Sequence, residues 1–564
     1  MLKNKAVSLR VLRGVIFLVL SMVSGLASCK DQDASAGISP TITTTVSAFA
    51  TPALLASGGG NAVITWSSTN STSCSSSPGG VIGTSGSFPV SVTTTATYTI
   101  SCVGSTGSAS QGVTITVVSS TPVLGLIKGA AKACAATPMS ATNVYYYCDC
   151  GTGKAAGCVA GDDANAGTSS SAPRQTIAKA IAQLNSLSGN NTIAFCQGGA
   201  FNATGQLAID NKSCPAGTTC NDIREYTPTT FTSNAKPIIN VAAGASGIFA
   251  LNGNVGGVRF LNLKLNGSTG ASGDTGFFFY NGAHDVTMCN LDMNSFGTAV
   301  YDESGGTAAT RNIKLTGSNI TNSSGMGFLG SSNNLDISFN YWDGNGSSNV
   351  FDHTIYIGSA HELSGINVSS NYIHGQYGKT CLGTALVAHA AIDGLTVSNN
   401  TIVLDANQTS PGCWGIGFNN TTGNPHPVNY RHAVFSGNTI INGGNNSISI
   451  SSCPGCVIEN NLIIQDWVSG GATGITVSDG ANRERDDVNN DNTIRNNTFW
   501  FSSRTTGTNY GMRIGTEGVG YTVVNNTVSS AQKTGSLSCY IYNLPPASYS
   551  FVNNNHCHST VPNN

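Results

Sequence analysis

The chain has 564 residues, a formal net charge of −2 and only 9% charged side chains, together with 68 glycines and a hydrophobic fraction of 40%. This composition is typical of a folded, turn-rich β-protein and excludes a charged, disordered chain. No basic run occurs after residue 13. The sequence therefore argues against nucleic acid as a partner, because phosphate binding needs clustered lysine and arginine.

Residues 1–29 have the pattern of a processing segment. Basic residues up to Arg13 precede a short apolar run, and the segment ends in Leu-Ala-Ser-Cys at Cys29. This resembles a bacterial lipoprotein signal with Cys29 as the lipidated residue, and a plain secretory peptide is the alternative. Lys30 after the cysteine favours the outer membrane. We therefore expect an exported, lipid-anchored protein of the cell envelope.

The cysteine count agrees with export. Seventeen cysteines minus Cys29 leave sixteen, an even number that favours disulfides in an exported chain. Cys74 and Cys102 are expected to pair. Cys453 and Cys456 have the spacing of a metal or redox motif, but no second pair or nearby histidine accompanies them. A local turn disulfide is therefore expected there.

Residues 39–118, which follow a tether at 30–38, show the pattern of a small β-sandwich. Short strands rich in Thr, Ser and Val alternate with turns rich in Gly and Ser. Trp66, Cys74 and Cys102 make the segment resemble a bacterial immunoglobulin-like module, although the order Trp-Cys-Cys departs from the antibody pattern. We expect a spacer, with a sugar-binding module as the alternative.

After a linker at 119–142, residues 143–564 carry a repeated phrase: apolar-x-apolar, two or three small or polar residues, Asn, x, apolar. In one copy, Leu395 and Val397 are expected to face the core while Thr396 faces water. Asparagine tolerates left-handed geometry at the bend, and stacked amides can pair as a ladder. The irregular spacing indicates solenoid turns with variable loops. The predicted ladder residues are Asn340, Asn371, Asn400, Asn438, Asn461, Asn497, Asn526 and Asn554.

A second strand precedes the phrase in almost every copy. Ten such strands, at the roughly 4.8 Å separation of hydrogen-bonded strands, would form a rod on the order of 45–50 Å long. The predicted strands are Gly276–Phe279, Ala299–Asp302, Gly327–Gly330, Thr354–Ile357, Ala385–Ala388, Gly415–Phe418, Ser447–Ile450, Gly474–Val477, Gly511–Ile514 and Cys539–Tyr542.

This pattern resembles the right-handed parallel β-helix of pectate-lyase-like proteins. The run from Gly161 to Thr168, followed by Pro173, looks like the opening of many such domains. Apolar residues at helical spacing from Ile177 to Leu184 predict a helix that plugs the open end of the solenoid. The expected fold is all-β: a right-handed parallel β-helix, a single-stranded solenoid of about ten or more turns, preceded by the small immunoglobulin-like sandwich.

Period-two alternation identifies the outward side chains of the first strand in each turn. If the isoleucines that flank Tyr356 face inward, Tyr356 faces outward, and stacking places Tyr301 and Val387 in the same column. The next outward column is Tyr280, Glu303, Ser331, Gly358 and His389.

These columns form the predicted binding groove, because aromatic rings stack on sugar faces and the resembled family holds extended polysaccharides along the solenoid. The expected partner is therefore a polysaccharide or surface glycan. The substrate-binding candidates are Tyr280, Tyr301, Asp302, Glu303, Arg311 and Lys379. The catalytic candidates are Asp352, His353, Tyr356 and His389.

One reaction open to this cluster is β-elimination on a uronic-acid polymer. His353 or His389 would remove the proton next to the substrate carboxylate, and Tyr356 would protonate the leaving oxygen. Lys379 or Arg311 would neutralise the carboxylate as the enediolate forms.

Hydrolysis is the other reaction, and it needs two carboxylates, such as Asp302 or Glu303 with Asp352. Histidine and tyrosine outnumber carboxylates here, which favours elimination. The sequence lacks the paired-Asp and Gly-His-Gly set of polygalacturonases and the Asp-Pro-His motif of alginate epimerases. Since a fold alone does not establish an activity, a non-catalytic adhesin or carbohydrate-binding rod remains the alternative.

No metal site is expected in the groove. Asp162, Asp163 and Asn165 have oxygen atoms of the kind that bind Ca²⁺, and a turn is the alternative explanation for them.

Overall fold

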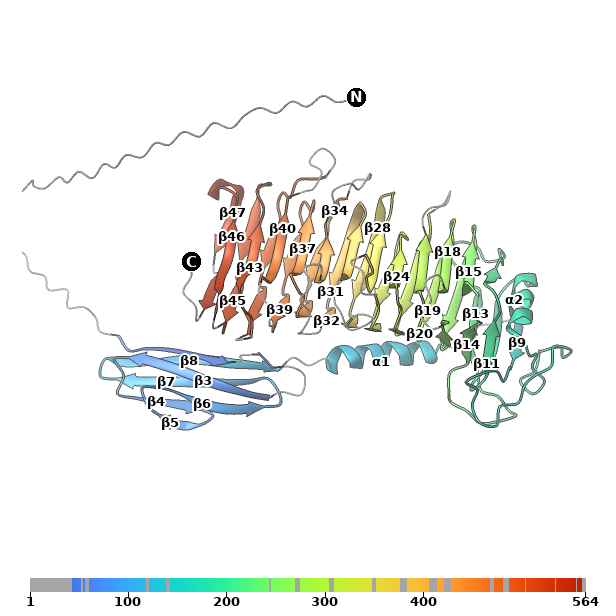
Figure 1. Cartoon of the computed structure of the whole chain (residues 1–564), viewed down its shortest axis with the longest axis horizontal. Helices are drawn as coiled ribbons and strands as arrows, with labels where there is room; N and C mark the ends of the chain where they lie inside the picture. The colour runs from blue at the N-terminus through green and yellow to red at the C-terminus, as the bar shows by residue number, and fades with distance from the viewer. Residues whose placement is uncertain are drawn as a thin grey trace, which may run out of the picture.

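The computed structural model contains an amino-terminal β-module and a long solenoid (Figure 1). Residues 1–42, with Cys29 and the expected signal and tether, lie outside the described residues, and so do Lys379 and Asn554. The described residues are 43–51, 54–55, 60–117, 121–137, 143–242, 245–268, 274–303, 309–346, 351–375, 383–404, 413–419, 428–466, 471–479, 486–502, 504–532, 534–553 and 555–559.

The amino-terminal module consists of two largely antiparallel sheets that share one hydrophobic core. Trp66 is buried in this core, and its indole N–H donates to the carbonyl of Gly83 at 2.8 Å. Cys74 and Cys102, the pair expected from the sequence, are joined by a disulfide between neighbouring strands. The strands are β1 (Thr45–Thr51), β3 (Gly60–Thr69) and β6 (Ser85–Val92) in one sheet, and β2 (Leu54–Leu55), β8 (Gly107–Val117), β7 (Ala96–Gly104), β4 (Ser73–Ser77) and β5 (Gly80–Ile82) in the other.

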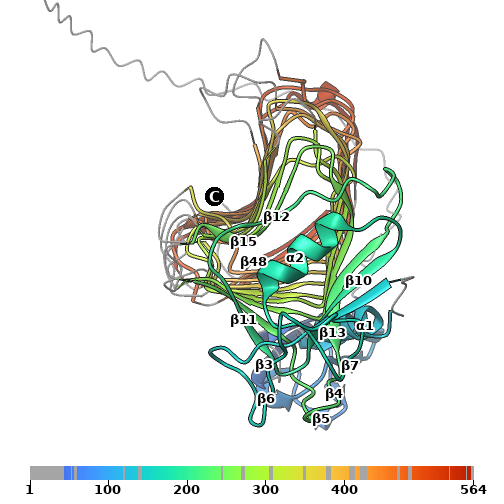
Figure 2. The ribbon, with the colours of Figure 1, turned by 90° about the vertical axis from the view of Figure 1, so that its right-hand side faces the viewer.

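The rest of the chain coils into a right-handed parallel β-helix. Figure 2 shows its turns stacked behind one another. Three parallel sheets form the walls, so a typical turn contributes one strand to each wall. The sequence predicted two strands a turn. The third arises because the Asn phrase bends in its middle, so that the residues before and after the asparagine belong to different sheets.

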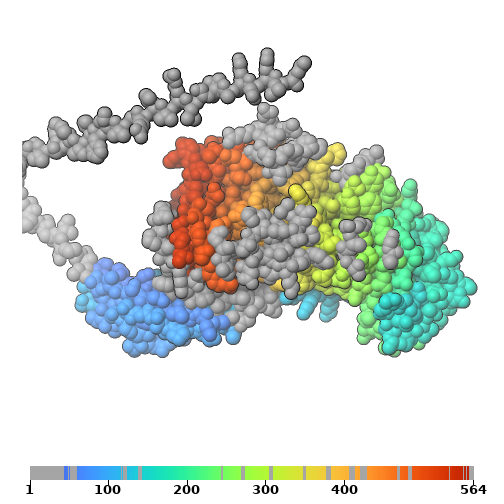
Figure 3. Space-filling model, in the orientation of Figure 1, coloured from blue at the N-terminus to red at the C-terminus, as the bar shows by residue number. Residues whose placement is uncertain are grey.

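All ten predicted first strands fall in one 12-stranded sheet, which begins with two further strands. Eleven intervals at about 4.8 Å make this wall roughly 53 Å long, and Figure 3 shows the turns as one continuous body. Its strands are β12 (Leu207–Ile209), β15 (Gly247–Asn252), β18 (Thr275–Tyr280), β21 (Thr298–Glu303), β24 (Met326–Gly330), β27 (Ile355–Gly358), β30 (Thr384–His389), β33 (Trp414–Phe418), β37 (Asn446–Ser451), β40 (Thr473–Ser478), β43 (Thr508–Ile514) and β46 (Ser536–Tyr542).

The second wall is a 15-stranded sheet that contains the strands before the ladder asparagines. As predicted, Leu395 and Val397 are buried while Thr396 is only partly covered. Its strands are β9 (Asn143–Tyr147), β10 (Asn191–Cys196), β13 (Asn221–Tyr226), β16 (Gly256–Leu261), β19 (His284–Cys289), β22 (Arg311–Thr316), β25 (Asp336–Ser338), β28 (Leu363–Ser369), β31 (Ile392–Ser398), β34 (Tyr430–Arg431), β35 (Val434–Ser436), β38 (Val457–Glu459), β41 (Thr493–Arg495), β44 (Tyr521–Val524) and β47 (Tyr549–Asn553).

The third wall is a 13-stranded sheet that contains the strands after the ladder asparagines. A short 3₁₀ helix, η2 (Pro546–Ser548), lies between the last turns. The strands are β11 (Ala200–Ala203), β14 (Ile238–Val241), β17 (Lys264–Asn266), β20 (Asp292–Asn294), β23 (Asn319–Thr321), β26 (Tyr341–Asp343), β29 (Tyr372–His374), β32 (Thr401–Val403), β36 (Thr439–Ile441), β39 (Leu462–Gln465), β42 (Thr498–Phe501), β45 (Thr527–Ser530) and β48 (His556–Ser559).

The asparagine ladder forms inside the bend between the second and third walls. Each side-chain amide donates to the side-chain oxygen of the next asparagine, at 2.9–3.2 Å, and to a backbone carbonyl. The last described rung was predicted one residue too early, because Asn526 donates to Asn555. The ladder runs through Asn340, Asn371, Asn400, Asn438, Asn461, Asn497, Asn526 and Asn555.

The left-handed residue of each bend also differs from the prediction. It is the residue before the ladder asparagine, as at Phe339 with φ 58° and Ser370 with φ 55°. The chain changes direction at this residue, because the asparagine that follows leads into the strand of the next wall with its side-chain amide directed inward. Asparagine therefore stabilises the bend through its amide bonds rather than through its own backbone conformation.

The helix predicted at the open end of the solenoid is α2 (Ile177–Ser186), which lies across that end in Figure 2. Ile177, Ala180, Ile181 and Leu184 are its buried residues, as their spacing predicted.

The segment expected to be a linker contains α1 (Thr121–Ala135). A disulfide joins Cys134 of this helix to Cys289, and the carbonyl of Thr137 accepts a hydrogen bond from Arg224 at 2.6 Å. The segment is rich in alanine, the best helix former, and its helix packs on the second wall rather than spanning open solvent.

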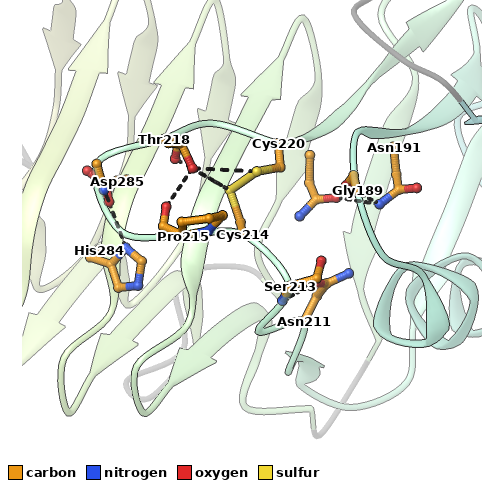
Figure 4. The surroundings of a disulfide bond; sticks show 12 residues. Gly189, Asn191, Asn211, Ser213, Cys214, Pro215, Thr218, Cys220, His284 and Asp285 are labelled. Carbon is orange, nitrogen blue, oxygen red and sulfur yellow. Dashed lines mark hydrogen bonds and ion pairs between the residues drawn. A yellow bond between two sulfur atoms is a disulfide. The ribbon is translucent and has the colours of Figure 1, made fainter.

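Short-range disulfides pin several loops. Figure 4 shows Cys214 bonded to Cys220. Within the loop that this disulfide closes, the backbone N–H of Gly217 donates to Asp285. The expected turn disulfide between Cys453 and Cys456 is present. The remaining pairs among the described residues are Cys148–Cys196, Cys150–Cys158 and Cys539–Cys557. Among the described residues, no helix is both long enough and apolar enough to cross a membrane.

Candidate functional site

The outer face of the 12-stranded sheet has the column order that the sequence predicted. Tyr301 pairs with Leu329, which pairs with Tyr356, which pairs with Val387. In the adjacent column, Gly358 pairs with His389. Parallel pairing without bulges keeps equivalent residues in line, so residues far apart in sequence share one wall.

Three rings on this wall pack against one another, and we call His353, Tyr356 and His389 the ring cluster. The centroids of His353 and Tyr356 lie 5.6 Å apart with the planes inclined by 21°, and those of Tyr356 and His389 lie 5.7 Å apart. His353 comes just before β27, and His389 ends the next strand, β30. The phenol therefore contacts both imidazoles.

Glycine at position 358 makes room for the tyrosine of the ring cluster. A Cβ atom at Gly358 would lie 2.3 Å from Cε1 of Tyr356 and 3.0 Å from its hydroxyl oxygen. Real Cβ atoms do not approach other atoms so closely. The missing side chain thus allows the phenol to lie along the strand toward His389.

The histidines of the ring cluster are fixed by backbone groups. Nδ1 of His389 lies 2.8 Å from the carbonyl oxygen of Asn419. Since a carbonyl only accepts, Nδ1 carries the proton, and Nε2 keeps a free lone pair. Nδ1 of His353 lies 3.1 Å from both the nitrogen and the oxygen of Thr384.

Burial shifts the pKa values of all three rings. It lowers the pKa of His353 to about 4, and it also lowers the pKa of His389 from 6.5. Burial raises the pKa of Tyr356 above 10. At neutral pH the ring cluster therefore holds two neutral imidazoles and a protonated phenol, which is a base and acid pair. His389 is the more accessible base, because His353 is only 7% exposed.

A second aromatic group lies further along the same wall, toward the amino terminus. Phe278 is stacked with Tyr280 at 5.9 Å and contacts Tyr301 at 5.4 Å. Burial raises the pKa of Tyr301, and the neighbouring Glu303 raises it further. Tyr280 and Glu303 pair in register. The structure thus brings three predicted groove residues together two strands away from the ring cluster.

Asp302 is wrong as a groove residue. It is 1% exposed, and its carboxylate accepts hydrogen bonds from the hydroxyl of Ser332 and the backbone of Ser331. Burial raises its pKa. Alternation explains the correction, because its neighbours Tyr301 and Glu303 face outward. Asp302 is thereby removed from the carboxylate pair considered for hydrolysis.

Arg311 is also placed away from the predicted groove. It begins β22 in the 15-stranded sheet, and its guanidinium donates to the side-chain oxygen of Asn254 at 3.5 Å. β21 and β22 follow each other in the chain but belong to different walls, so Arg311 does not lie on the wall of the ring cluster. Asp352 is half-buried immediately before His353, and Lys379 lies outside the described residues.

The acidic loop near α2 bonds to its own chain. Asp163 accepts from the backbone N–H groups of Gln175 and Thr176 at 3.0 and 2.9 Å. Asn165 donates to the carbonyl of Pro173, and Asp162 accepts from Ala164. These contacts organise the turn at the start of the helix. No group of three or more His, Cys, Asp or Glu side chains suited to a metal ion occurs in the described ranges.

A third aromatic group, on the 13-stranded sheet, was not predicted. Tyr341 and Tyr372 stack with centroids 5.6 Å apart and planes 5° apart. Asp343 accepts from Tyr341 and lies 2.9 Å from Nδ1 of His374. The signal was present in the sequence, because each tyrosine directly follows a ladder asparagine. Aligning that position would have found the pair.

The strand pairing defines this chain as a right-handed parallel β-helix protein. No family model and no curated protein matches its sequence. Similar solved structures include the A-module of mannuronan C-5 epimerase AlgE6 from Azotobacter vinelandii, with 14% identity and a TM-score of 0.38 over 68% of this chain and 94% of that chain. Tailspike protein 3 of bacteriophage CBA120 has 14% identity and a TM-score of 0.39, over 69% and 59% of the two chains. An alginate lyase from Paenibacillus sp. str. FPU-7 has 16% identity and a TM-score of 0.29, over 65% and 96%.

Proposed function

We propose that the solenoid binds an extended acidic polysaccharide along the outer face of the 12-stranded sheet and cleaves it by β-elimination at the ring cluster. One observation carries this proposal: the phenol of Tyr356 lies against His389, whose Nε2 is left unprotonated because Nδ1 donates to Asn419. A neutral base and a protonated acid in contact on one wall are the two groups that the reaction needs.

Binding along this wall is supported by the aromatic side chains that recur on neighbouring strands. Phe278, Tyr280 and Tyr301 precede Tyr356 on the same face. Aromatic rings offer large apolar surfaces, and tyrosine adds a polar handle. Such a row suits a chain of sugar rings that lies parallel to the solenoid axis.

The reaction balances with groups of this chain. Nε2 of His389 removes the proton next to the uronate carboxylate, and the C–H electrons form the new C=C bond. The bond to the leaving oxygen breaks, and that oxygen takes the phenolic proton of Tyr356. The imidazolium and phenolate then return to their starting states by proton exchange with water. Products are a shortened chain and an unsaturated uronate.

The test uses the purified chain from residue 30 onward with pectin, alginate and glycosaminoglycans. Wild-type protein is expected to form unsaturated product, seen by its ultraviolet absorbance. Tyr356→Phe and His389→Ala are each expected to lower kcat by about 10²–10⁴-fold, the usual share of general acid–base catalysis. Tyr372→Phe, on another wall, is the control. Undiminished cleavage by both cluster variants would refute the assignment.

A non-catalytic carbohydrate-binding rod is the second candidate. The stacked Tyr341 and Tyr372 favour it, because binding platforms on two walls require no common reaction centre. In this case the polymers bind in affinity electrophoresis without releasing product. Tyr372→Ala is then expected to weaken polymer binding. Neither the wild type nor Tyr356→Phe is expected to cleave the polymer.

We also propose that lipid on Cys29 anchors the chain to the outer membrane and that an immunoglobulin-like module at 39–118 is the spacer. The lipoprotein-like sequence at residues 1–29 supports the anchor. Cys29→Ala is expected to move the protein from the membrane fraction to the soluble fraction. Retention in the membrane fraction would contradict the proposal.

A further inference from the structure

A cavity of about 310 Å³ opens at the amino-terminal end of the 15-stranded sheet, on a different wall from the ring cluster. This volume is at the lower end of the roughly 300–1,000 Å³ typical of small-molecule sites. The cavity is lined by Tyr146 of β9, by Gln197 just after β10, and by Arg224, Glu225, Tyr226 and Thr227 in and after β13.

The charged pair in the cavity has unused hydrogen-bonding capacity. Arg224 is only 5% exposed, and it donates to Glu225 at 3.3 Å and to the carbonyl of Thr137 at 2.6 Å. Its Nε–H is buried and has no partner among the described residues, and Oε2 of Glu225 is in the same condition. Unpaired buried polar groups are costly, so a donor and an acceptor of this kind in the lining of one cavity favour a binding site.

The tyrosines supply both an apolar wall and a third unused polar atom. Tyr146 and Tyr226 meet edge to face with centroids 4.9 Å apart. Tyr226 is 5% exposed, and its buried hydroxyl has no partner in the described chain. Gln197 accepts from Thr227 at 3.1 Å, which holds the amide at the rim.

We infer that this cavity binds one neutral sugar ring. The Arg224–Glu225 pair has no net charge, so the site does not select an ion. It offers an unpaired donor beside an unpaired acceptor, and adjacent sugar hydroxyls both donate and accept. The tyrosine wall matches the apolar C–H face of a pyranose.

This site does not depend on the elimination reaction. It lies on another wall, near the capped end of the solenoid, and would hold a terminal sugar or side branch of a glycan. A glycan that binds the groove with its main chain and this cavity with a terminal sugar or side branch would contact the protein at two separate sites, which raises the effective affinity.

The decisive variant is Tyr226→Phe, because it removes only the unpaired hydroxyl. The probes are the methyl glycosides of glucose, galactose, mannose and N-acetylglucosamine, examined by saturation-transfer NMR and calorimetry on the chain from residue 30 onward. At least one glycoside is expected to bind, and Tyr226→Phe is expected to weaken it about 2- to 10-fold, the value of one hydrogen bond. Tyr145→Phe, on β9 next to Tyr146 but outside the cavity lining, is the control.

Melting temperature separates binding from folding. Tyr226→Phe is expected to melt at or above the wild-type temperature, because it deletes a buried group without a partner. Tyr356→Phe is expected to leave glycoside binding unchanged, which distinguishes this site from the groove. The inference is overturned if no neutral glycoside binds, if only glucuronate or inorganic phosphate binds, or if Tyr226→Phe binds as well as the wild type.

Discussion

The ladder residue Asn400 is the most direct test of how the solenoid is stabilised. Its side chain is fully buried and makes four hydrogen bonds. Oδ1 accepts from the backbone and side-chain nitrogens of Asn371, both at 3.0 Å. Nδ2 donates to the carbonyl of Val368 at 2.8 Å and to Asn438 at 3.0 Å. Each neighbouring turn is therefore bonded to it.

In Asn400→Ala, the buried N–H of Asn371 loses its acceptor, and the carbonyl of Val368 loses its side-chain donor. A buried group left without a partner costs about 1–3 kcal/mol. The two groups together predict a loss of about 2–5 kcal/mol in the free energy of unfolding, because the neighbouring amides keep part of their bonding.

The assay is urea unfolding followed by far-UV circular dichroism and tryptophan fluorescence. The control is Asn319→Ala on the third wall, where an exposed amide donates to Asp292 at 2.7 Å. An exposed substitution of this kind is expected to change stability by at most about 0.5 kcal/mol. Equal unfolding midpoints for the two variants would refute the view that the ladder amides hold the turns together.

Three further predictions concern the ring cluster. Gly358→Ala is expected to displace Tyr356 and to lower kcat at least about tenfold with little change in melting temperature; unchanged kcat would contradict the close approach. The cleavage rate is expected to be constant from below pH 6.5 to above pH 10, because the lowered pKa of His389 and the raised pKa of Tyr356 keep the base and the acid in their active forms. A decrease in rate on acidification with its midpoint at or above pH 6.5 would disprove this prediction. The pKa of His353 is 6.5 in the unfolded chain but about 4 in the folded protein. The free energy of unfolding is therefore expected to fall by up to about 3 kcal/mol as the pH drops from 6.5 to 4. In His353→Gln, the urea midpoint should not show this decrease.

Local patterning was sufficient for much of the fold. Period-two alternation placed Tyr301, Tyr356 and Val387 in one column, because parallel strands in a solenoid pair in register without slipping. The same reasoning placed His389 beside Gly358. Alternation also places Asp302 inward, against its assignment to the groove, and it does not show that Arg311 belongs to another wall.

Two features required the assembled structure, the cavity around Arg224 and the helix α1. The cavity around Arg224 depends on β9, β10 and β13 meeting beside α1, whose helical state the sequence did not predict. Side-chain alternation says nothing about such meetings, since it describes one strand at a time.

The sequence by itself determined the stacked, all-β architecture, the amide ladder and the wall that carries the ring cluster, because each follows from a repeat whose period is set by backbone geometry. Only the tertiary structure decided which polar groups are buried, how the imidazoles are fixed and where a cavity lies. Those properties depend on contacts between segments that are distant in the chain, and no local pattern encodes them.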